Sequence, residues 1–198
     1  MFDIQSVNET MIFLDRDGTI NKNFEEGPIY TKEKFELIPG AAKGIKMIKD
    51  LGLKVVVVTN QGGINHIDRD FNWINYREIE KLMNDMIFEQ SGSRVDDVFL
   101  CHHANYENCE CRKPKIGLLK MALEKYKFNP KVSYIIGDSA ADIKAGFRFG
   151  LKTILVKSSW KKNVESRLAE EEIFPDFIFP DILEAAHFIR QSIGESSK

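Results

Sequence analysis

The sequence predicts an α/β fold in which helices cover both faces of a parallel sheet. Two observations carry this prediction: short apolar runs alternate with longer amphipathic ones along the chain, and polar or glycine residues follow the apolar runs. Such alternation is typical of strand–helix–strand units, which build parallel sheets with right-handed crossovers. A typical domain has about 150 residues, so the 198 residues are expected to form a single domain, 1–198, with a short polar tail at 194–198.

The predicted strands are short and rich in β-branched or aromatic residues, as buried strands are. They are Met11–Leu14, Leu53–Val58, Val98–Leu100, Tyr134–Ile136, Thr153–Val156 and Phe177–Phe179. The predicted helices have apolar residues at helical spacing. They are Ala41–Leu51, Tyr76–Gln90, Ile116–Tyr126, Ala140–Phe149 and Ile182–Ile193. Ligands of such sheets bind outside the carboxyl ends of the strands, so the residues that follow each strand are the candidates for function.

Composition excludes several classes of protein. Lys and Arg number 28 against 30 Asp and Glu, which gives a net charge of -2 and disfavours binding of nucleic acid or anionic membranes through a broad basic field. No apolar run is long enough to span a membrane, and the N-terminal residues lack the pattern of a signal peptide. We expect a cytoplasmic monomer whose partner is a small molecule, with neither nucleic acid nor a membrane as partner.

Two carboxylates follow the first predicted strand, Asp15 and Asp17. Residues i and i+2 of an extended segment point to the same side, and two close carboxylates repel unless a cation compensates them. Oxygen ligands suit Mg²⁺, and Gly18 lets the backbone turn tightly beside a ligand. An EF-hand calcium loop is disfavoured because positions five and nine from Asp15 are Thr19 and Asn23.

The other strand ends carry polar residues with two interpretations each. The segment Thr59–Gly62 either cradles phosphate oxygens with its hydroxyl and backbone N–H groups or is ordinary turn chemistry. Asp138 follows the fourth strand and can supply a third oxygen ligand for Mg²⁺. Asp142 either supports that site from behind or only complements a helix N-terminus. Arg112 and Lys113 either neutralise a phosphoryl group or form a solvated helix entry.

All three cysteines lie in one short segment, 101–111. Cys101, His103, Cys109 and Cys111 have a spacing that suits a tetrahedral zinc site, and a site with four protein ligands is structural. His102 is the competing ligand, but side chains alternate at a strand end, so Cys101 and His103 should face the same way. Incidental thiols or a redox pair are the alternatives.

The order of these motifs resembles the haloacid dehalogenase (HAD) superfamily of phosphatases. The likeness rests on Asp15–Thr19, Thr59–Asn60, Lys113 and Gly137–Asp142, each of which follows a predicted strand. The resemblance implies that Asp15 is the nucleophile and that Asp17 is the general acid and base. It also implies that Mg²⁺ is held by the Asp15 and Asp138 side chains and the Asp17 backbone carbonyl.

One branch of this superfamily is closer, the heptose 1,7-bisphosphate phosphatases and histidinol-phosphate phosphatases. Phe13–Asn21, Thr59–Gln61 and Cys109–Pro114 carry the likeness, which implies a zinc loop and no large cap domain. By resemblance, a further set of residues binds phosphate and substrate: Asn23, Phe24, Glu25, Glu26, Thr59, Asn60, Gln61, Gly62, Arg112 and Lys113. Asn65–Asn75 is a further place for substrate contacts, although its aromatic residues could equally be ordinary packing.

We therefore expect a Mg²⁺-dependent phosphatase that acts on a phosphorylated sugar, foremost heptose 1,7-bisphosphate at its 7-phosphate. Gln61–Ile64 favours the heptose enzymes, whereas the short zinc loop is also typical of histidinol-phosphate phosphatases. A zinc-stabilised binding protein without turnover is a more remote alternative, since such a protein has no need of both Asp15 and Asp17.

Overall fold

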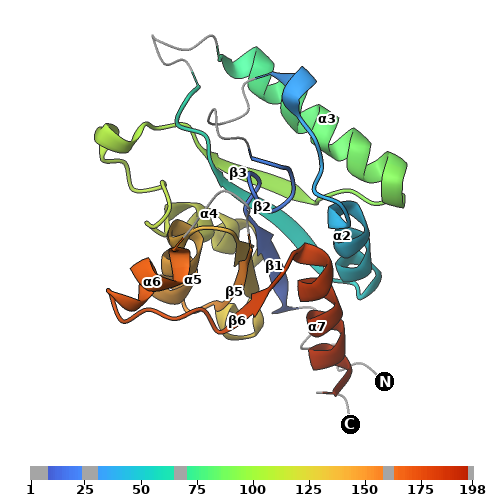
Figure 1. Cartoon of the computed structure of the whole chain (residues 1–198), viewed down its shortest axis with the longest axis vertical. Helices are drawn as coiled ribbons and strands as arrows, with labels where there is room; N and C mark the ends of the chain where they lie inside the picture. The colour runs from blue at the N-terminus through green and yellow to red at the C-terminus, as the bar shows by residue number, and fades with distance from the viewer. Residues whose placement is uncertain (1–8, 24–30, 65–70, 158–162, 196–198) are drawn as a thin grey trace.

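Six parallel strands form a single sheet at the centre of the computed structural model, which describes residues 9–23, 31–64, 71–157 and 163–195 (Figure 1). Their order across the sheet is β3-β2-β1-β4-β5-β6, and every pairing is parallel. The strands are β1 (Met11–Leu14), β2 (Lys54–Asn60), β3 (Asp97–Cys101), β4 (Tyr134–Gly137), β5 (Lys152–Val156) and β6 (Phe177–Phe179). The predicted parallel α/β sheet is confirmed.

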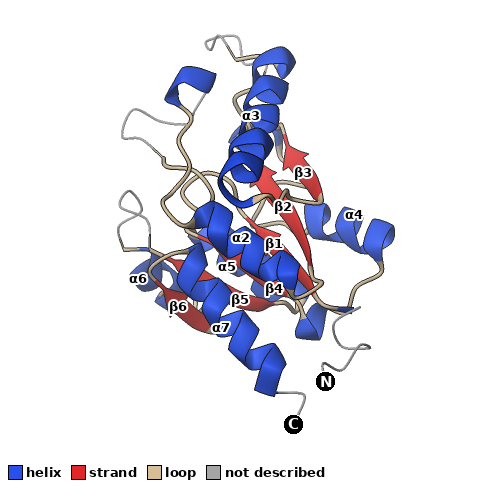
Figure 2. Cartoon of the chain, turned by 90° about the vertical axis from the view of Figure 1, so that its right-hand side faces the viewer, coloured by secondary structure: helices blue, strands red, loops and turns tan. Residues whose placement is uncertain are grey.

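Helices lie on both sides of this sheet (Figure 2). They are α2 (Ala41–Asp50), α3 (Trp73–Ser91), α4 (Gly117–Tyr126), α5 (Ala140–Phe149), α6 (Val164–Ala169) and α7 (Ile182–Glu195). The connecting segments that the structure describes contain three short 3-10 helices, Lys32–Lys34, Asn105–Glu107 and Pro130–Val132. No helix among the described residues is both long and apolar enough to cross a membrane.

Alternation along β1 shows why the fold has three layers. Ile12 and Leu14 pack with the buried faces of α2, α3 and α7, whereas Met11 and Phe13 pack with residues of α4 and α5. Successive side chains of a strand point to opposite faces, so a strand that is apolar throughout must be covered on both sides. All four residues are 1% exposed or less, and this double burial explains the uninterrupted apolar run in the sequence.

All of the predicted strands and helices are present, and the differences in their bounds have local causes. Helix α3 begins at Trp73 rather than Tyr76 because the Asn72 side chain accepts hydrogen bonds from Ile74 N and Asn75 N and caps the helix earlier. Strand β2 extends to Asn60, where it still pairs with Cys101 of β3. The short helix α6 was not predicted from the sequence.

The strand order reverses at the centre of the sheet. The chain proceeds from β1 to β2 and β3 on one side, and β4, β5 and β6 lie on the other. In open parallel sheets, ligands bind at the carboxyl end of the strands where the order reverses. Here that point lies between β1 and β4, directly beside Asp15 and Asp138.

Candidate functional site

Three buried carboxylates meet at the carboxyl ends of β1 and β4. The side chains of Asp15, Asp138 and Asp142 each offer an oxygen within 4.8 Å of the others. Gly18 turns the loop after β1 with a φ of 89°, and a Cβ at this position would lie 1.9 Å from Asp138 Oδ2. A side chain at position 18 would therefore displace a carboxylate of this cluster, which is the physical reason for glycine here.

Lys113 is the cation that faces these carboxylates. Its Nζ donates hydrogen bonds to Asp15 Oδ1 at 2.9 Å, Asp142 Oδ1 at 2.5 Å and the Val58 carbonyl oxygen at 2.6 Å. Burial opposes the charge on this amine, but the carboxylates of Asp142 and Asp15 outweigh that effect and raise the pKa of Lys113. Lys113 is 4% exposed and is held as an ammonium at neutral pH.

The donor set fits a divalent metal ion. Three carboxylates face one ammonium among these four side chains, so the group has an excess of negative charge in a buried place. Oxygen donors alone match the preference of Mg²⁺. The cluster contains Asp142, which the sequence interpretation placed only behind the site. Asp142 also accepts hydrogen bonds from Ser139 N and Ser139 Oγ, so the same residue caps α5 and supports Lys113.

Asn60 holds the backbone of Lys113 in place. Asn60 Nδ2 donates to the Lys113 carbonyl oxygen, and Lys113 N donates to Asn60 Oδ1, both at 3.0 Å. The sequence interpretation assigned Asn60 to substrate binding, but here both polar atoms of its amide are engaged with a residue far along the chain. Thr59, which is buried, accepts a hydrogen bond from Gln61 Nε2 at 2.9 Å.

The carboxylate of Asp17 lies outside the three-carboxylate group. Asp17 Oδ1 accepts hydrogen bonds from Arg16 Nε and Asn21 Nδ2, and Asp17 Oδ2 accepts from Arg16 Nη2 and Gln61 Nε2. Burial raises the pKa of Asp17, but the Arg16 charge and the hydrogen bonds from Gln61, Asn21 and Arg16 more than reverse this and lower it overall. Sequence reasoning gave no role to Arg16, although an arginine between two carboxylates at a strand end was a visible signal.

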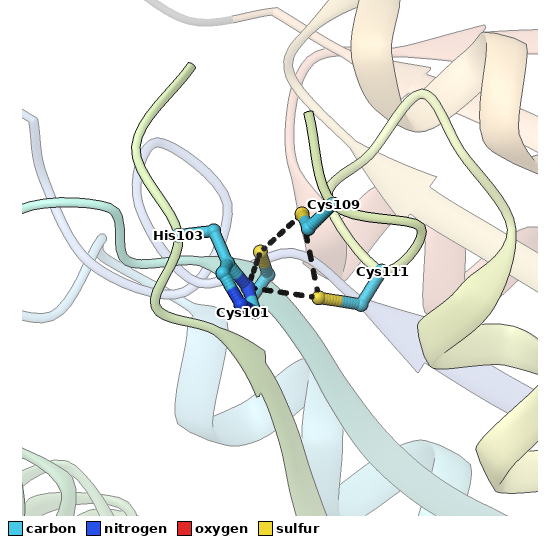
Figure 3. A group of neighbouring side chains, drawn as sticks. All are labelled: Cys101, His103, Cys109 and Cys111. Atoms are coloured by element: carbon cyan, nitrogen blue, oxygen red, sulfur yellow. Dashed lines mark hydrogen bonds between the residues drawn. The ribbon is translucent and has the colours of Figure 1, made fainter. Parts of the chain in front are cut away.

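The four predicted zinc ligands converge at the end of β3 (Figure 3). His103 Nδ1 lies 3.5 Å from Cys101 Sγ and 3.3 Å from Cys111 Sγ, and Cys109 Sγ lies 3.6 Å from both other sulfurs. Zn–S bonds of about 2.3 Å and Zn–N bonds of about 2.0 Å require edges of about 3.5 to 3.8 Å in a tetrahedron. The competing ligand His102 is exposed and lies against Trp73 instead, with ring centroids 5.4 Å apart.

This cysteine–histidine cluster (Cys101, His103, Cys109 and Cys111) is joined to the strand ends. Gln61 N donates to the Cys101 carbonyl oxygen at 2.7 Å, and a Cβ on Gly62 would lie 2.5 Å from the His103 carbonyl oxygen. Arg112 Nη1 also donates to that His103 oxygen at 3.2 Å. The loop of the cluster therefore packs closely against the segment that follows β2.

The remaining predicted substrate contacts divide into two groups. Asn23 is half-buried beside the loop that follows β1. Phe24, Glu25 and Glu26 lie outside the described residues, as do residues 65–70. Phe71 is 1% exposed and belongs to the core, so the packing interpretation of this aromatic residue is right.

The chain is similar to a known family model and to named proteins. Residues 110–185 match the family model described as HAD-hydrolase-like. The chain is 34% identical over 145 residues to the D-glycero-beta-D-manno-heptose-1,7-bisphosphate 7-phosphatase of Helicobacter pylori, which covers 73% of this chain and 82% of that protein. It is 30% identical over 185 residues to the enzyme of the same name from Haemophilus ducreyi, which covers 90% of this chain and 97% of that protein.

A solved structure shares the architecture. The D,D-heptose 1,7-bisphosphate phosphatase from B. bronchiseptica, crystallised with magnesium and phosphate, matches with a TM-score of 0.82 and 26% identity. The match covers 92% of this chain and 99% of that one. The HAD resemblance drawn from the motifs is confirmed. The chain therefore belongs to the HAD-like hydrolases and is a phosphoric monoester hydrolase of the group that contains the heptose-1,7-bisphosphate 7-phosphatases.

Proposed function

We propose that this phosphatase removes the 7-phosphate of D-glycero-D-manno-heptose 1,7-bisphosphate. The observation that carries the proposal is the placement of Asp15 against Lys113 at the carboxyl ends of the central strands, in a chain whose relatives are named for this reaction. The phosphoryl group of a sugar phosphate suits a site that combines buried carboxylates with a fixed cation, because phosphoryl transfer depends mainly on positioning and charge.

Asp15 supplies the nucleophile in the proposed reaction. One of its carboxylate oxygens forms a bond to phosphorus while the bond from phosphorus to the sugar oxygen breaks. Asp17 gives a proton to that departing oxygen, and later takes a proton from the water that attacks the aspartyl-phosphate. The attack of this water breaks the bond between Asp15 and phosphorus and releases inorganic phosphate.

Other residues of the site bind and orient the phosphoryl group. Asn60 holds the backbone of Lys113, and the Lys113 ammonium lies against Asp15, where it can neutralise the transferring group. Thr59 offers a buried hydroxyl at the end of β2. Mg²⁺ would be held by Asp15, Asp138 and the Asp17 backbone carbonyl and would stabilise the charge that develops on the phosphoryl oxygens.

The cysteine–histidine cluster would hold structural zinc. All four positions of a tetrahedral ion would be filled by Cys101, His103, Cys109 and Cys111, which leaves none for water. Its expected effect is to fix the loop that leads directly into Arg112 and Lys113. Purified protein should contain about one zinc ion per chain, and a preparation without zinc that keeps full activity and stability would contradict the zinc assignment.

A phosphate-release screen tests the substrate. Heptose 1,7-bisphosphate, other sugar phosphates and histidinol phosphate are compared by kcat/KM in the presence of Mg²⁺. The expected result is the highest kcat/KM for the heptose bisphosphate, with release of the 7-phosphate identified by NMR of the product. A preference for histidinol phosphate by orders of magnitude would overturn the substrate assignment and leave the phosphatase chemistry standing.

A further inference from the structure

Arg16 is a charged residue in the interior that the reaction above does not use. It lies between Asp15 and Asp17 in the sequence, yet it is 1% exposed and is among the largest fully buried side chains. Its guanidinium points to Asp17 as a fork: Nε donates to Asp17 Oδ1 and Nη2 donates to Asp17 Oδ2, each at 3.0 Å. Two parallel hydrogen bonds of this kind fix the plane of a carboxylate as well as its position.

Other donors complete the cradle of the Asp17 carboxylate. Gln61 Nε2 donates to Asp17 Oδ2 at 2.8 Å, and Asn21 Nδ2 donates to Asp17 Oδ1 at 3.0 Å. Gln61 Oε1 in turn accepts from Arg16 Nη2 at 2.9 Å. Each oxygen of Asp17 thus accepts two hydrogen bonds, and the side chain cannot rotate without breaking several of them.

One aromatic ring of α3 lies near the Arg16 guanidinium. The guanidinium carbon lies 5.9 Å from the centroid of the Tyr76 ring, and Trp73 packs edge-on against Tyr76 with centroids 6.2 Å apart. Trp73 also contacts His102, the neighbour of the predicted zinc ligand His103. Arg16 therefore lies near α3, and Trp73 of that helix contacts the loop of the cysteine–histidine cluster.

Packing alone does not account for an arginine here. Its third nitrogen, Nη1, is buried without a hydrogen-bond partner among the described residues, and a buried polar group left unpaired destabilises a fold by about 1–3 kcal/mol. An apolar side chain of similar size would avoid this penalty but would leave the Asp17 carboxylate without its ion pair, so the arginine is tied to the charge of Asp17. Local choices that oppose stability are typical of functional sites.

We propose that Arg16 is a positioning residue that aims the Asp17 carboxylate for proton transfer in phosphate hydrolysis. The inference rests on the proposed function of Asp17. Asp17 gives its proton to the departing sugar oxygen as the P–O bond breaks, and accepts a proton from water as that water bonds to phosphorus. Both transfers need one oxygen of Asp17 at hydrogen-bond distance from the reacting atom. Asn21 Nδ2 or Gln61 Nε2 must give up its hydrogen bond for that purpose, while the Arg16 fork keeps the carboxylate in place.

The test compares two leaving groups in the variant Arg16→Met. Nitrophenolate leaves without a proton, so the first turnover with 4-nitrophenyl phosphate needs no acid, whereas a sugar oxygen does. We expect the stopped-flow burst of nitrophenolate to stay within about twofold of wild type, and single-turnover cleavage of the sugar phosphate to fall by about 10- to 100-fold. Steady-state turnover of both substrates should fall, because hydrolysis of the aspartyl-phosphate also uses Asp17.

Further variants make each outcome decisive. Arg16→Lys keeps the positive charge but lacks the two parallel hydrogen bonds of the guanidinium. We therefore expect its single-turnover rate of sugar-phosphate cleavage to stay nearly as low as that of Arg16→Met. A wild-type rate in Arg16→Lys would overturn the inference. Arg94→Met, which removes an exposed arginine that bonds to Asp85, should behave as wild type. Equal loss of burst and sugar-phosphate cleavage in folded Arg16→Met would indicate a merely structural role and would also overturn it.

A second variant and the activity of the wild type distinguish a failure of the Arg16 inference from a failure of the proposed function. If Arg16→Met does not fold, Gln61→Met removes two hydrogen bonds of the same cradle and should give the same dependence on leaving group with a smaller loss. If wild type itself hydrolyses neither substrate with Mg²⁺, the proposed function fails. If wild type is active and no variant of the cradle distinguishes the leaving groups, only the role of Arg16 fails.

Discussion

The carboxylate site and the cysteine–histidine cluster are neighbours that the chain assembles in opposite ways. Asp15, Lys113 and Asp138 come from three distant points of the sequence, and the parallel sheet brings them together. The four residues of the cluster all lie within the segment Cys101–Cys111. One site depends on the whole fold, whereas the other depends on a short loop and the ion that it would bind. Variants of one site, of the other, and of the residues between them test this difference, and the largest effect is expected for Asp15.

Asp15→Asn should remove activity and leave the fold intact. The amide is a poor nucleophile, so we expect phosphate release to fall by at least about 10³-fold, while circular dichroism and zinc content stay as in wild type. Asp50→Asn, which alters an exposed partner of Lys46 on α2, is the matched control. Turnover of Asp15→Asn near the wild-type rate would show that another group attacks phosphorus.

Cys109→Ser should disrupt the cysteine–histidine cluster directly and lower the rate of phosphate release indirectly. Loss of one thiolate is expected to release zinc and to lower kcat by about 10- to 100-fold through a loosened Lys113, as for residues that orient a metal site or its surroundings. Metal analysis by mass spectrometry and the rate of phosphate release are measured together. Tyr106→Phe, 75% exposed on the same loop, is the control. Zinc loss without any change in rate would mean that the loop does not position Lys113.

Asn60→Ala tests the clamp between the two regions. It removes both hydrogen bonds to the Lys113 backbone, and leaving such groups unpaired should lower the free energy of unfolding by about 1–3 kcal/mol. We expect kcat/KM to fall while zinc content is unchanged, because the cluster itself is untouched. Urea unfolding and steady-state kinetics measure the two effects. Wild-type kinetics at reduced stability would confine Asn60 to a structural role.

Gly62→Ala should have the smallest effect. The added Cβ would lie 2.5 Å from the His103 carbonyl oxygen and 2.9 Å from Arg112 Nη1, so the loop must shift. Overpacking of this kind lowers stability by about 1–3 kcal/mol, and we expect KM to rise more than kcat falls because Asp15 and Lys113 are not displaced. Thermal unfolding and substrate titration measure this, and an unchanged KM would contradict contact of the loop with substrate.

Sequence patterns predicted the elements and motifs that depend on residues close together in the chain. They did not predict the contacts that depend on the direction in which a side chain points. Both bounds of β1 and α5 were predicted, because each element is short, strongly patterned and bounded by polar or glycine residues. Helix α6 was missed because its six residues, VESRLA, carry too few apolar positions for a helical pattern.

Within the site, the sequence indicated the candidate residues but not all of their hydrogen-bond partners. The carboxylates Asp15, Asp17 and Asp138 and the four cluster residues follow recognisable spacings. The engagement of Asn60 with Lys113 joins residues on different elements, and the fork of Arg16 depends on which way one side chain turns from a strand end. The monomeric state, the cytoplasmic location and the assignment of residues 1–198 to one domain stay predictions.

The double anchoring of the loop has a consequence for how this scaffold can change. Lys113 is held by Asn60 on the sheet side, and the segment before it is gathered by the cysteine–histidine cluster. Residues 104–108 form an arc between His103 and Cys109, and Asn105, Tyr106, Glu107 and Asn108 in it are exposed. We expect insertions or replacements in that arc to change the exposed surface beside Arg112 without moving the Lys113 ammonium group. Selectivity for the substrate can therefore diverge while the phosphoryl-transfer apparatus stays the same.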